Sequence, residues 1–386
     1  MIKSRRQVIL CIGIAIGRLL TGSTFINAQK NTRTEINIPD IPGFVTLKCD
    51  FHMHTVFSDG NVWPDFRSQE SWADGLDAVA ITDHIEHRPH QDDLVQNLNR
   101  SYEIALPAAD LLNLLLTHAA EVTADMPPGH FNVLFLHDAT PLDSKDWREV
   151  LKRASEQGAF VFWNHPGWKK PNEQPIWYAE HDEILQNKWM QGIEIVNERS
   201  YYPEAFRWAL EKKLTILGNS DSHDPIATFY DKAGGDPRPL TLVFARERTP
   251  ESLREALFAR RTVVFRRDSL MGEEQFLRPI LKASMDVLNS RVEIKGNGHA
   301  YLQIRNKSDI PLQLELQNQL EEVGILGKLT LPAQKVSLFP ITGMKKGTKG
   351  SRQFTAHYLV TNFRTTPDAG LPLDLTFQVD FLLAAE

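Results

Sequence analysis

The feature that most constrains this chain is an alternation of short apolar runs with helical segments, repeated from about residue 45 to residue 265. Short apolar runs between turn residues predict buried strands, and a periodicity near 3.6 predicts helices. Strands that alternate with helices indicate a parallel α/β architecture. In a parallel α/β barrel the carboxyl ends of the strands meet on one face, where active sites are built.

The expected strands are 45–51, 77–82, 114–121, 131–136, 159–163, 192–196, 214–217, 241–245 and 262–265. The expected helices are 65–74, 92–109, 146–157, 203–212 and 251–260. Together they predict one α/β domain over residues 45–283.

Two histidines, His52 and His54, stand where the first expected strand ends. Residues i and i+2 of a strand point to the same face, so one metal ion can take both imidazoles. Asp59 follows in a Ser-Asp-Gly turn, where Gly60 lets the chain double back towards the same place.

Histidines and carboxylates follow several later strands in the same way. The candidate metal ligands are His52, His54, Asp59, His84, Glu121, His130, His165, Asp221 and His223. Imidazole and carboxylate ligands suit Zn²⁺, Mn²⁺ or Fe²⁺. His137 is an alternative to His130, because it lies at the far end of the same expected strand.

Three further polar residues lie beside these motifs. Arg88 is a candidate for a bidentate grip on a phosphate oxygen, with a solvated loop position as the alternative. Asp83 precedes a candidate ligand and is expected to orient an imidazole without binding the metal itself. Asn197 at a strand end is expected to be a satisfied turn amide, with substrate contact as the alternative.

The motifs together resemble the polymerase and histidinol phosphatase (PHP) family. HxH with a trailing SDG, ITDH, a glutamate, GH, NHP and SDSH occur in that order, and the match covers about residues 45–268. The resemblance implies a distorted (β/α)7 barrel and a trinuclear centre that hydrolyses phosphoesters. The residues around the motifs are most similar to exported bacterial phosphodiesterases, including ones that act on organophosphate diesters.

The resemblance also implies a ligand set for each of three divalent ions, Mn, Zn or Fe. The first ion would be held by His52, His54, Glu121 and Asp221, the second by Glu121, His130 and His165, and the third by Asp59, His84 and His223. The candidate catalytic residues are Glu121 and Asp221 from these ligand sets, together with Arg88 from its position beside the second motif. A hydroxide shared by two ions would attack a small phosphodiester.

Two other functions fit the same motifs. The first is a phosphomonoesterase or an amidohydrolase-type hydrolase, because a metal hydroxide attacks phosphorus or carbon. The second is an exported, non-catalytic binding protein in which the metal is structural.

The sequence changes character after about residue 284. Short segments alternate apolar and polar residues with turn residues between several of them, which predicts a small all-β sandwich over residues 284–386. The expected strands are 292–295, 300–305, 312–316, 327–331, 335–340, 354–363 and 373–381. None of the metal motifs lies in this region.

Residues 1–28 have the layout of a signal peptide, with basic residues, an apolar run and a small-residue end at Ala28. Ser4-Arg5-Arg6 also resembles a twin-arginine signal. The apolar run is shorter than a membrane span requires, so we do not expect it to remain as a membrane anchor. We expect an exported protein, periplasmic or secreted, with no stable membrane span once the signal is removed. Residues 29–44 are an expected leader.

Removal of residues 1–28 would take away four cations and no acid, which moves the formal net charge from −6 to −10. An acidic surface repels phosphate backbones, so bulk nucleic acid is not an expected partner. Cys49 would be the one remaining cysteine, so no intramolecular disulfide can form.

Overall fold

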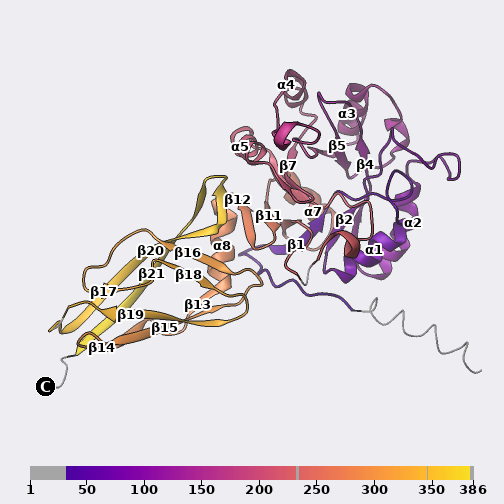
Figure 1. The fold of residues 1–386 in the computed structure, drawn as a ribbon. Coiled ribbons are helices and arrows are strands. Elements are labelled where there is room, and N and C mark those ends of the chain that lie inside the picture. The colour runs from indigo at the N-terminus through magenta and orange to yellow at the C-terminus, as the bar shows by residue number, and fades with distance from the viewer. Residues whose placement is uncertain (1–31, 232–233, 346, 383–386) are drawn as a thin grey trace, which may run out of the picture.

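The computed structural model describes residues 32–231, 234–345 and 347–382, which form two lobes side by side in an elongated molecule (Figure 1). The expected signal peptide lies outside the described residues. Among the described residues, no helix is long and apolar enough to cross a membrane.

The larger lobe contains the α/β region. Its strands are β1 (Val45–Asp50), β2 (Ala78–Ala80), β3 (Leu115–Thr117), β4 (Ala119–Val122), β5 (Phe131–Leu134), β6 (Phe160–Trp163), β7 (Gly192–Asn197), β8 (Ser200–Tyr201), β9 (Thr215–Asn219), β10 (Leu240–Ala245), β11 (Thr262–Arg266) and β12 (Ser269–Gly272). Its helices are α1 (Pro64–Ala73), α2 (Arg100–Leu111), α3 (Trp147–Glu156), α4 (Ala179–Gln186), α5 (Pro203–Lys212), α6 (Ile226–Phe229), α7 (Pro250–Phe258) and α8 (Glu274–Ser284).

Helix starts in this lobe follow from local sequence. Pro64, Pro203 and Pro250 stand at the first position of their helices, where a missing N–H costs nothing and the fixed φ suits the helix. The side chains of Asp146 and Thr249 cap α3 and α7 by accepting hydrogen bonds from backbone N–H groups. These signals explain why the sequence located these helices within one or two residues.

The expected helix 92–109 is wrong in its first half, because α2 begins only at Arg100. The side-chain oxygen of Asn97 accepts a hydrogen bond from the Asn99 backbone N–H at 2.9 Å. Such local side-chain bonds compete with helical ones and favour a turn. The expected strand 114–121 is also interrupted at His118, where the chain passes from β3 in one sheet to β4 in another.

The strands of this lobe form two sheets of mixed direction. In the first sheet β1, β2 and β3 are parallel neighbours, whereas β1, β10, β11 and β12 pair antiparallel. In the second sheet β4, β5 and β6 pair antiparallel, and β6, β7 and β9 are parallel. The expectation of parallel strands throughout is therefore wrong, because hairpin connections such as the one between β4 and β5 reverse the chain.

Isolated bridges join the two sheets at two places. Met53 pairs with Ser222, and His84 pairs with Glu121. Both bridges involve candidate metal ligands or their immediate neighbours. The seams between the sheets therefore bring together residues that are up to about 170 positions apart.

The smaller lobe is a β-sandwich (Figure 1). Its strands are β13 (Met285–Val287), β14 (Arg291–Lys295), β15 (His299–Asn306), β16 (Leu312–Leu316), β17 (Val323–Gly324), β18 (Lys328–Leu331), β19 (Val336–Gly343), β20 (Gly350–Thr366) and β21 (Ala369–Leu382). One sheet has the order β13-β15-β19-β17, and β14, β21, β20, β16 and β18 belong to the other. The seven strands expected from alternation are all present.

The two lobes share a sheet and a core. β12 of the larger lobe pairs in parallel with β20 of the smaller one, with Leu270 opposite Phe363. Helix α8, which the sequence did not indicate, lies at the junction (Figure 1) and buries Leu277 and Ile280. One cluster of buried side chains therefore extends through both lobes.

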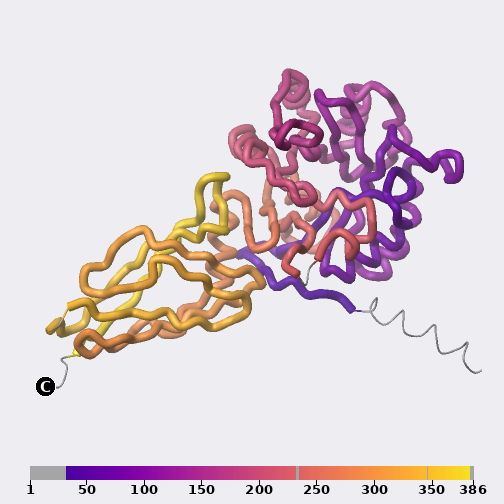
Figure 2. Tube along the Cα trace, in the orientation of Figure 1, coloured from indigo at the N-terminus to yellow at the C-terminus, as the bar shows by residue number. Residues whose placement is uncertain are grey.

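Residues 32–44, the described part of the expected leader, are packed against both lobes (Figure 2). Arg33 forms an ion pair with Asp77 of the larger lobe at 2.8 Å. The backbone N–H of Asn37 donates to the Asp309 carboxylate of the smaller lobe at 2.7 Å. Ile38 and Ile41 are buried in the shared core.

His181 in α4 is expected to make the free energy of unfolding depend on pH. Its ring stacks on Trp163, its Nδ1 accepts a hydrogen bond from the Tyr178 backbone N–H, and its Nε2 lies 2.8 Å from the Pro128 carbonyl. Burial lowers the pKa of His181 from 6.5 to about 4. Between pH 6.5 and pH 4 the His181 side chain is therefore protonated in the unfolded chain but neutral in the folded protein. The free energy of unfolding should fall as the pH falls through this range, by about 3 kcal/mol once pH 4 is passed.

Urea unfolding of the wild type and His181→Gln at a series of pH values tests this expectation. Because glutamine does not titrate, the wild type should lose stability relative to the variant between pH 6.5 and pH 4. Parallel stability curves for the two proteins would contradict it.

Candidate metal centre

The loop after β1 positions the first two histidines. The His54 backbone N–H donates to the Ser222 carbonyl at 3.0 Å, and Arg67 donates to the His54 carbonyl at 2.8 Å. Gly60 closes the loop against this backbone, because a Cβ there would lie 2.6 Å from the His54 carbonyl carbon. The sequence Ser-Asp-Gly therefore presents Asp59 to the same place as the imidazoles.

Glu121 stands at the centre of the imidazole cluster. Its Oε2 lies 3.0 Å from His52 Nε2 and 3.2 Å from His54 Nε2. Its Oε1 lies 2.8 Å from His130 Nδ1 and 3.7 Å from His165 Nε2. The carboxylate is completely buried, so its charge is balanced by these neighbours rather than by water.

Asp221 faces the same two histidines from the loop after β9. Its Oδ1 is 3.1 Å from His52 Nε2 and 3.0 Å from His54 Nε2. The side-chain amide of Asn197 donates to Asp221 Oδ2 at 3.2 Å and to Glu194 Oε2 at 2.9 Å. Asn197 is therefore a satisfied amide, although it also lines the pocket over the cluster.

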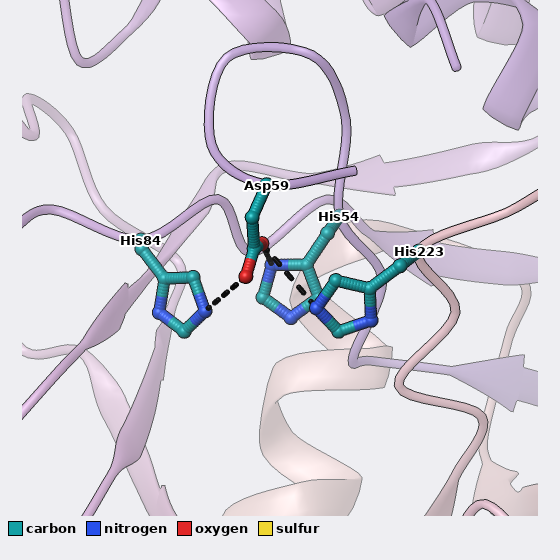
Figure 3. A group of neighbouring side chains, drawn as sticks. All are labelled: His54, Asp59, His84 and His223. Carbon is teal, nitrogen blue, oxygen red and sulfur yellow. Dashed lines mark ion pairs between the residues drawn. The ribbon is translucent and has the colours of Figure 1, made fainter. Parts of the chain in front are cut away.

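A second group lies on the outer side of the cluster (Figure 3). Asp59 Oδ1 is 3.3 Å from His223 Nε2 and 3.7 Å from His54 Nδ1, and Asp59 Oδ2 is 3.6 Å from His84 Nε2. The His54 ring is stacked between those of His84 and His223, at centroid distances of 4.6 Å and 4.3 Å. One carboxylate and three imidazoles therefore converge on one side of the site.

The charges of these groups are strongly coupled. Burial opposes ionisation of Glu121, but the facing His84 and His52 hold the pKa of its carboxyl well below the usual value. Burial likewise opposes a proton on His54, yet its bonds to Asp221 and Glu121 raise the pKa of its imidazole to about 9. The cluster thus favours ionised carboxylates facing protonated His52 and His54, whereas burial lowers the pKa of His84 to about 3.

The donor atoms also fit divalent ions. Ligands held about 2.1 Å from one tetrahedral ion lie roughly 3.4 Å from one another, close to most of the separations given above. Among the described residues, four overlapping groups have donor atoms within 4.8 Å of one another: His54, Asp59, His84 and His223; His52, Glu121 and His165; His52, His54 and Asp221; and His84, Glu121 and His130.

All nine candidate ligands belong to these groups. The grouping differs in detail from the expected one, since His54 also lies with the outer group and His84 also lies with Glu121. His130 is at the cluster, whereas the alternative His137 lines a separate pocket.

Arg88 is not brought to the cluster. Its guanidinium lies 3.7 Å from Asp143, and it lines neighbouring pockets rather than the one over the candidate ligands. From the same loop the exposed His87 lines that pocket instead, with Nε2 3.9 Å from Asp59 Oδ2. The structure therefore gives Arg88 no place in the catalytic set expected from the sequence.

Asp83 contacts the loop after β1 and not, as expected, an imidazole ring. Its carboxylate accepts hydrogen bonds from the Thr55 backbone and hydroxyl and from the Ser58 hydroxyl. Ser58 Oγ lies 3.3 Å from His54 Nδ1. The loop that carries Asp59 is thereby held in place.

Sequence reasoning missed Glu194 in β7. This buried carboxylate lies 3.0 Å from His52 Nδ1 and accepts hydrogen bonds from the His165 backbone N–H and the Asn219 amide. A carboxylate behind a metal-binding histidine fixes its tautomer and orientation. The available signal was a glutamate inside the otherwise apolar strand Gly-Ile-Glu-Ile-Val.

Replacing Glu194 with glutamine should weaken metal binding about 10- to 100-fold, because His52 loses the carboxylate that orients it. Chelator competition measures this affinity directly. Glu183→Gln is the matched control, because the wild-type Glu183 carboxylate forms an ion pair with Arg148 and belongs to none of the candidate metal-binding groups. An unchanged affinity in Glu194→Gln would contradict the assigned role.

A pocket of about 860 Å³ opens over the cluster. Besides the candidate ligands, its lining includes Trp168, Lys169, Lys170, Glu198 and Tyr202. Fold and site together define an α/β protein that can hold several divalent ions beneath a pocket large enough for a small molecule.

Comparisons with known proteins agree with this class. A crystal structure of a two-domain protein from Bacteroides vulgatus, described as containing a predicted PHP-like metal-dependent phosphoesterase, is 40% identical and has a TM-score of 0.84. The match covers 89% of this chain and 99% of that one. This chain therefore belongs to the PHP-like metal-dependent phosphoesterase family, as the motifs indicated.

Other similarities are partial. Residues 285–376 match a family described as an Ig-like domain. A proposed metal-dependent phosphoesterase from Bifidobacterium adolescentis is 17% identical, with a TM-score of 0.37, and an amidohydrolase from Chromobacterium violaceum is 15% identical, with a TM-score of 0.36. Each match covers 46% of this chain and 88% of the other. No curated protein sequence matches the chain.

Proposed function

We propose that this protein is a phosphodiesterase that hydrolyses small phosphodiesters at a trinuclear metal site. The observation that carries the proposal is the convergence of nine imidazole and carboxylate side chains, with the completely buried Glu121 among them. Within this proposal the two sheets of the larger lobe form one distorted barrel of seven βα units, which is supported by the bridges at their seams.

The proposed ligand sets are the ones that the motif resemblance implies: His52, His54, Glu121 and Asp221; Glu121, His130 and His165; and Asp59, His84 and His223. Each of these residues belongs to at least one group of converging donor atoms, although those groups divide the residues differently. Their mixture of nitrogen and oxygen donors suits Mn²⁺, Zn²⁺ or Fe²⁺. Such ions, when bound, supply a hydroxide nucleophile near neutral pH and neutralise charge on a phosphoryl group.

The protein's own residues prepare the site for that chemistry. Glu194 holds the Nδ1 side of His52, so its Nε2 faces Glu121 and Asp221. Asn197 donates to Asp221 and fixes the direction of that carboxylate. The groups are thus oriented before substrate arrives, which lowers the reorganisation needed during reaction.

Metal analysis paired with two chromogenic substrates tests the proposal. We expect close to three ions per chain, metal-dependent hydrolysis of bis(p-nitrophenyl) phosphate in preference to p-nitrophenyl phosphate, and loss of both activities in Asp221→Asn. Preference for the monoester would favour a phosphomonoesterase. Turnover of an amide substrate instead would favour an amidohydrolase-type reaction.

A non-catalytic exported protein with structural metal is the remaining alternative. It predicts that Asp221→Asn lowers stability while no substrate is turned over by the wild type. We also propose export to the periplasm or the medium, on the basis of the signal-like residues 1–28. Fractionation of cells that produce the full chain, with N-terminal sequencing of the product, tests that proposal.

A further inference from the structure

The pocket over the candidate ligands is larger than a reacting phosphate group requires. Its volume of about 860 Å³ lies in the range of pockets that enclose whole small molecules. The segment between β6 and α4 provides one wall, on which Trp168, Lys169 and Lys170 lie. The part of a substrate beyond its reacting ester would meet this wall.

Trp168 connects the wall to the candidate ligands. Its ring centroid is 4.9 Å from that of His130 and 5.2 Å from that of His165. Lys169 Nζ lies 3.8 Å from the centroid of the same indole ring. Because an ammonium over an indole face is held by cation–π attraction, the charge of Lys169 is kept beside the ligand cluster.

Lys170 is held in a different way on the same wall. Its ammonium donates a hydrogen bond to the Tyr178 hydroxyl at 2.9 Å and lies 5.2 Å from the Tyr178 ring centroid. This leaves further N–H groups of the ammonium for another acceptor. Two neighbouring ammonium groups therefore border the pocket, and each contacts an aromatic side chain.

Neither ammonium forms an ion pair within residues 32–231, 234–345 and 347–382. Lys152 and Lys307, by contrast, lie within 4.0 Å of carboxylates. Asp125, Glu173 and Glu198 also line the pocket, so its rim is not uniformly positive. The unpaired lysines mark the part of the rim where an anionic group would find positive charge.

We propose that the substrate carries a second anionic group, a phosphate or a carboxylate, which binds Lys169 and Lys170 while the reacting ester lies over the metal ligands. This inference rests on the proposed phosphodiesterase function and adds a substrate class to it. The lysines would favour diesters that carry a second anionic group, and they would take no part in hydrolysis of the ester itself.

Three diesters that differ at one end test the inference: propyl, 2-carboxyethyl and 2-phosphonoethyl p-nitrophenyl phosphate. We expect wild-type kcat/KM to be up to about fivefold higher for a charged diester than for the propyl one, the factor expected from an exposed ion pair. Added salt should reduce that preference. The group that gives the larger preference identifies the anion.

The double variant Lys169→Met/Lys170→Met should lose the preference for charge but keep turnover of the propyl diester. Lys169→Arg should retain the preference. Lys212→Met is the matched control, because Lys212 Nζ also lies over a tryptophan, 4.5 Å from the Trp177 ring centroid, but does not line this pocket. Equal kcat/KM for the three diesters in the wild type, or a preference that survives in the double variant, would overturn the inference.

A binding measurement separates this inference from the proposed function. Calorimetry on the metal-loaded protein compares 1,3-propanediphosphonate with propylphosphonate, neither of which requires turnover. Tighter binding of the two-ended probe by the wild type but not by the double variant supports the lysine site even if no diester is hydrolysed. Equal binding of the two probes by the wild type would refute the site even if diesterase activity is present.

Discussion

Replacing Glu121 with glutamine is expected to remove metal from the protein and to lower kcat/KM for a phosphodiester by at least about 10³-fold. The carboxylate is completely buried and contacts His52, His54 and His130 at 2.8 to 3.2 Å. Glutamine keeps the shape but loses the negative charge that would hold two ions together. Elemental analysis and steady-state kinetics on the same preparations measure both effects.

Glu103→Gln is the matched control for this substitution. Glu103 is a solvent-exposed helical residue that ion-pairs with Arg100, so the same chemical change should leave metal content and turnover unchanged. A Glu121→Gln protein with a full metal complement and near wild-type turnover would contradict the central position assigned to Glu121. A folded protein without metal or activity would agree with it.

Arg238→Met is expected to destabilise the fold by about 3–5 kcal/mol, the usual cost of leaving a buried charge without its partner. Arg238 is 4% exposed, and its guanidinium lies 2.9 Å from Asp50 and 3.2 Å from Asp74. Burial opposes its charge, but Asp74 and Asp50 raise the pKa of Arg238. Urea unfolding of metal-free protein measures the loss without a contribution from metal binding.

The same substitution should also disturb the site. Asp50 is completely buried and accepts hydrogen bonds from the backbone N–H groups of His52, a candidate ligand, and of Ser220, which precedes the candidate ligand Asp221. Adding Asp50→Asn to Arg238→Met removes the unpaired charge and should restore part of the stability. Arg291→Met, which breaks a surface pair with Asp380, is the control and should change little. A small effect of Arg238→Met alone would contradict the structural role assigned to the buried pair of Arg238 and Asp50.

Local signals in the sequence predicted much of the fold. Pro203 at the first turn and the apolar period located α5 at its observed bounds, and alternation located β16 in the same way. The start of α2 was placed too early, because Asn97 and Asn99 form a turn that periodicity does not reveal. Helix α8 was missed, although it packs at the junction of the two lobes.

The candidate site was predicted equally unevenly. The nine candidate ligands were recognisable because they occur in short motifs, most of which lie at the ends of strands, where a sheet gathers side chains. Arg88 was placed wrongly because the direction of a long side chain on a loop depends on its neighbours, here Asp143. Glu194 was missed because a buried glutamate within a strand has no motif of its own.

Motif spacing and strand periodicity are local properties of the chain, so they predicted the imidazole and carboxylate candidates, the family, and an α/β domain followed by an all-β domain. How these segments meet depends on the tertiary structure. Mixed strand directions, the bridges Met53–Ser222 and His84–Glu121, and the pairing of β12 with β20 all join residues distant along the chain. Such contacts depend on which surfaces pack together, so the wall of Trp168, Lys169 and Lys170 became visible only in three dimensions.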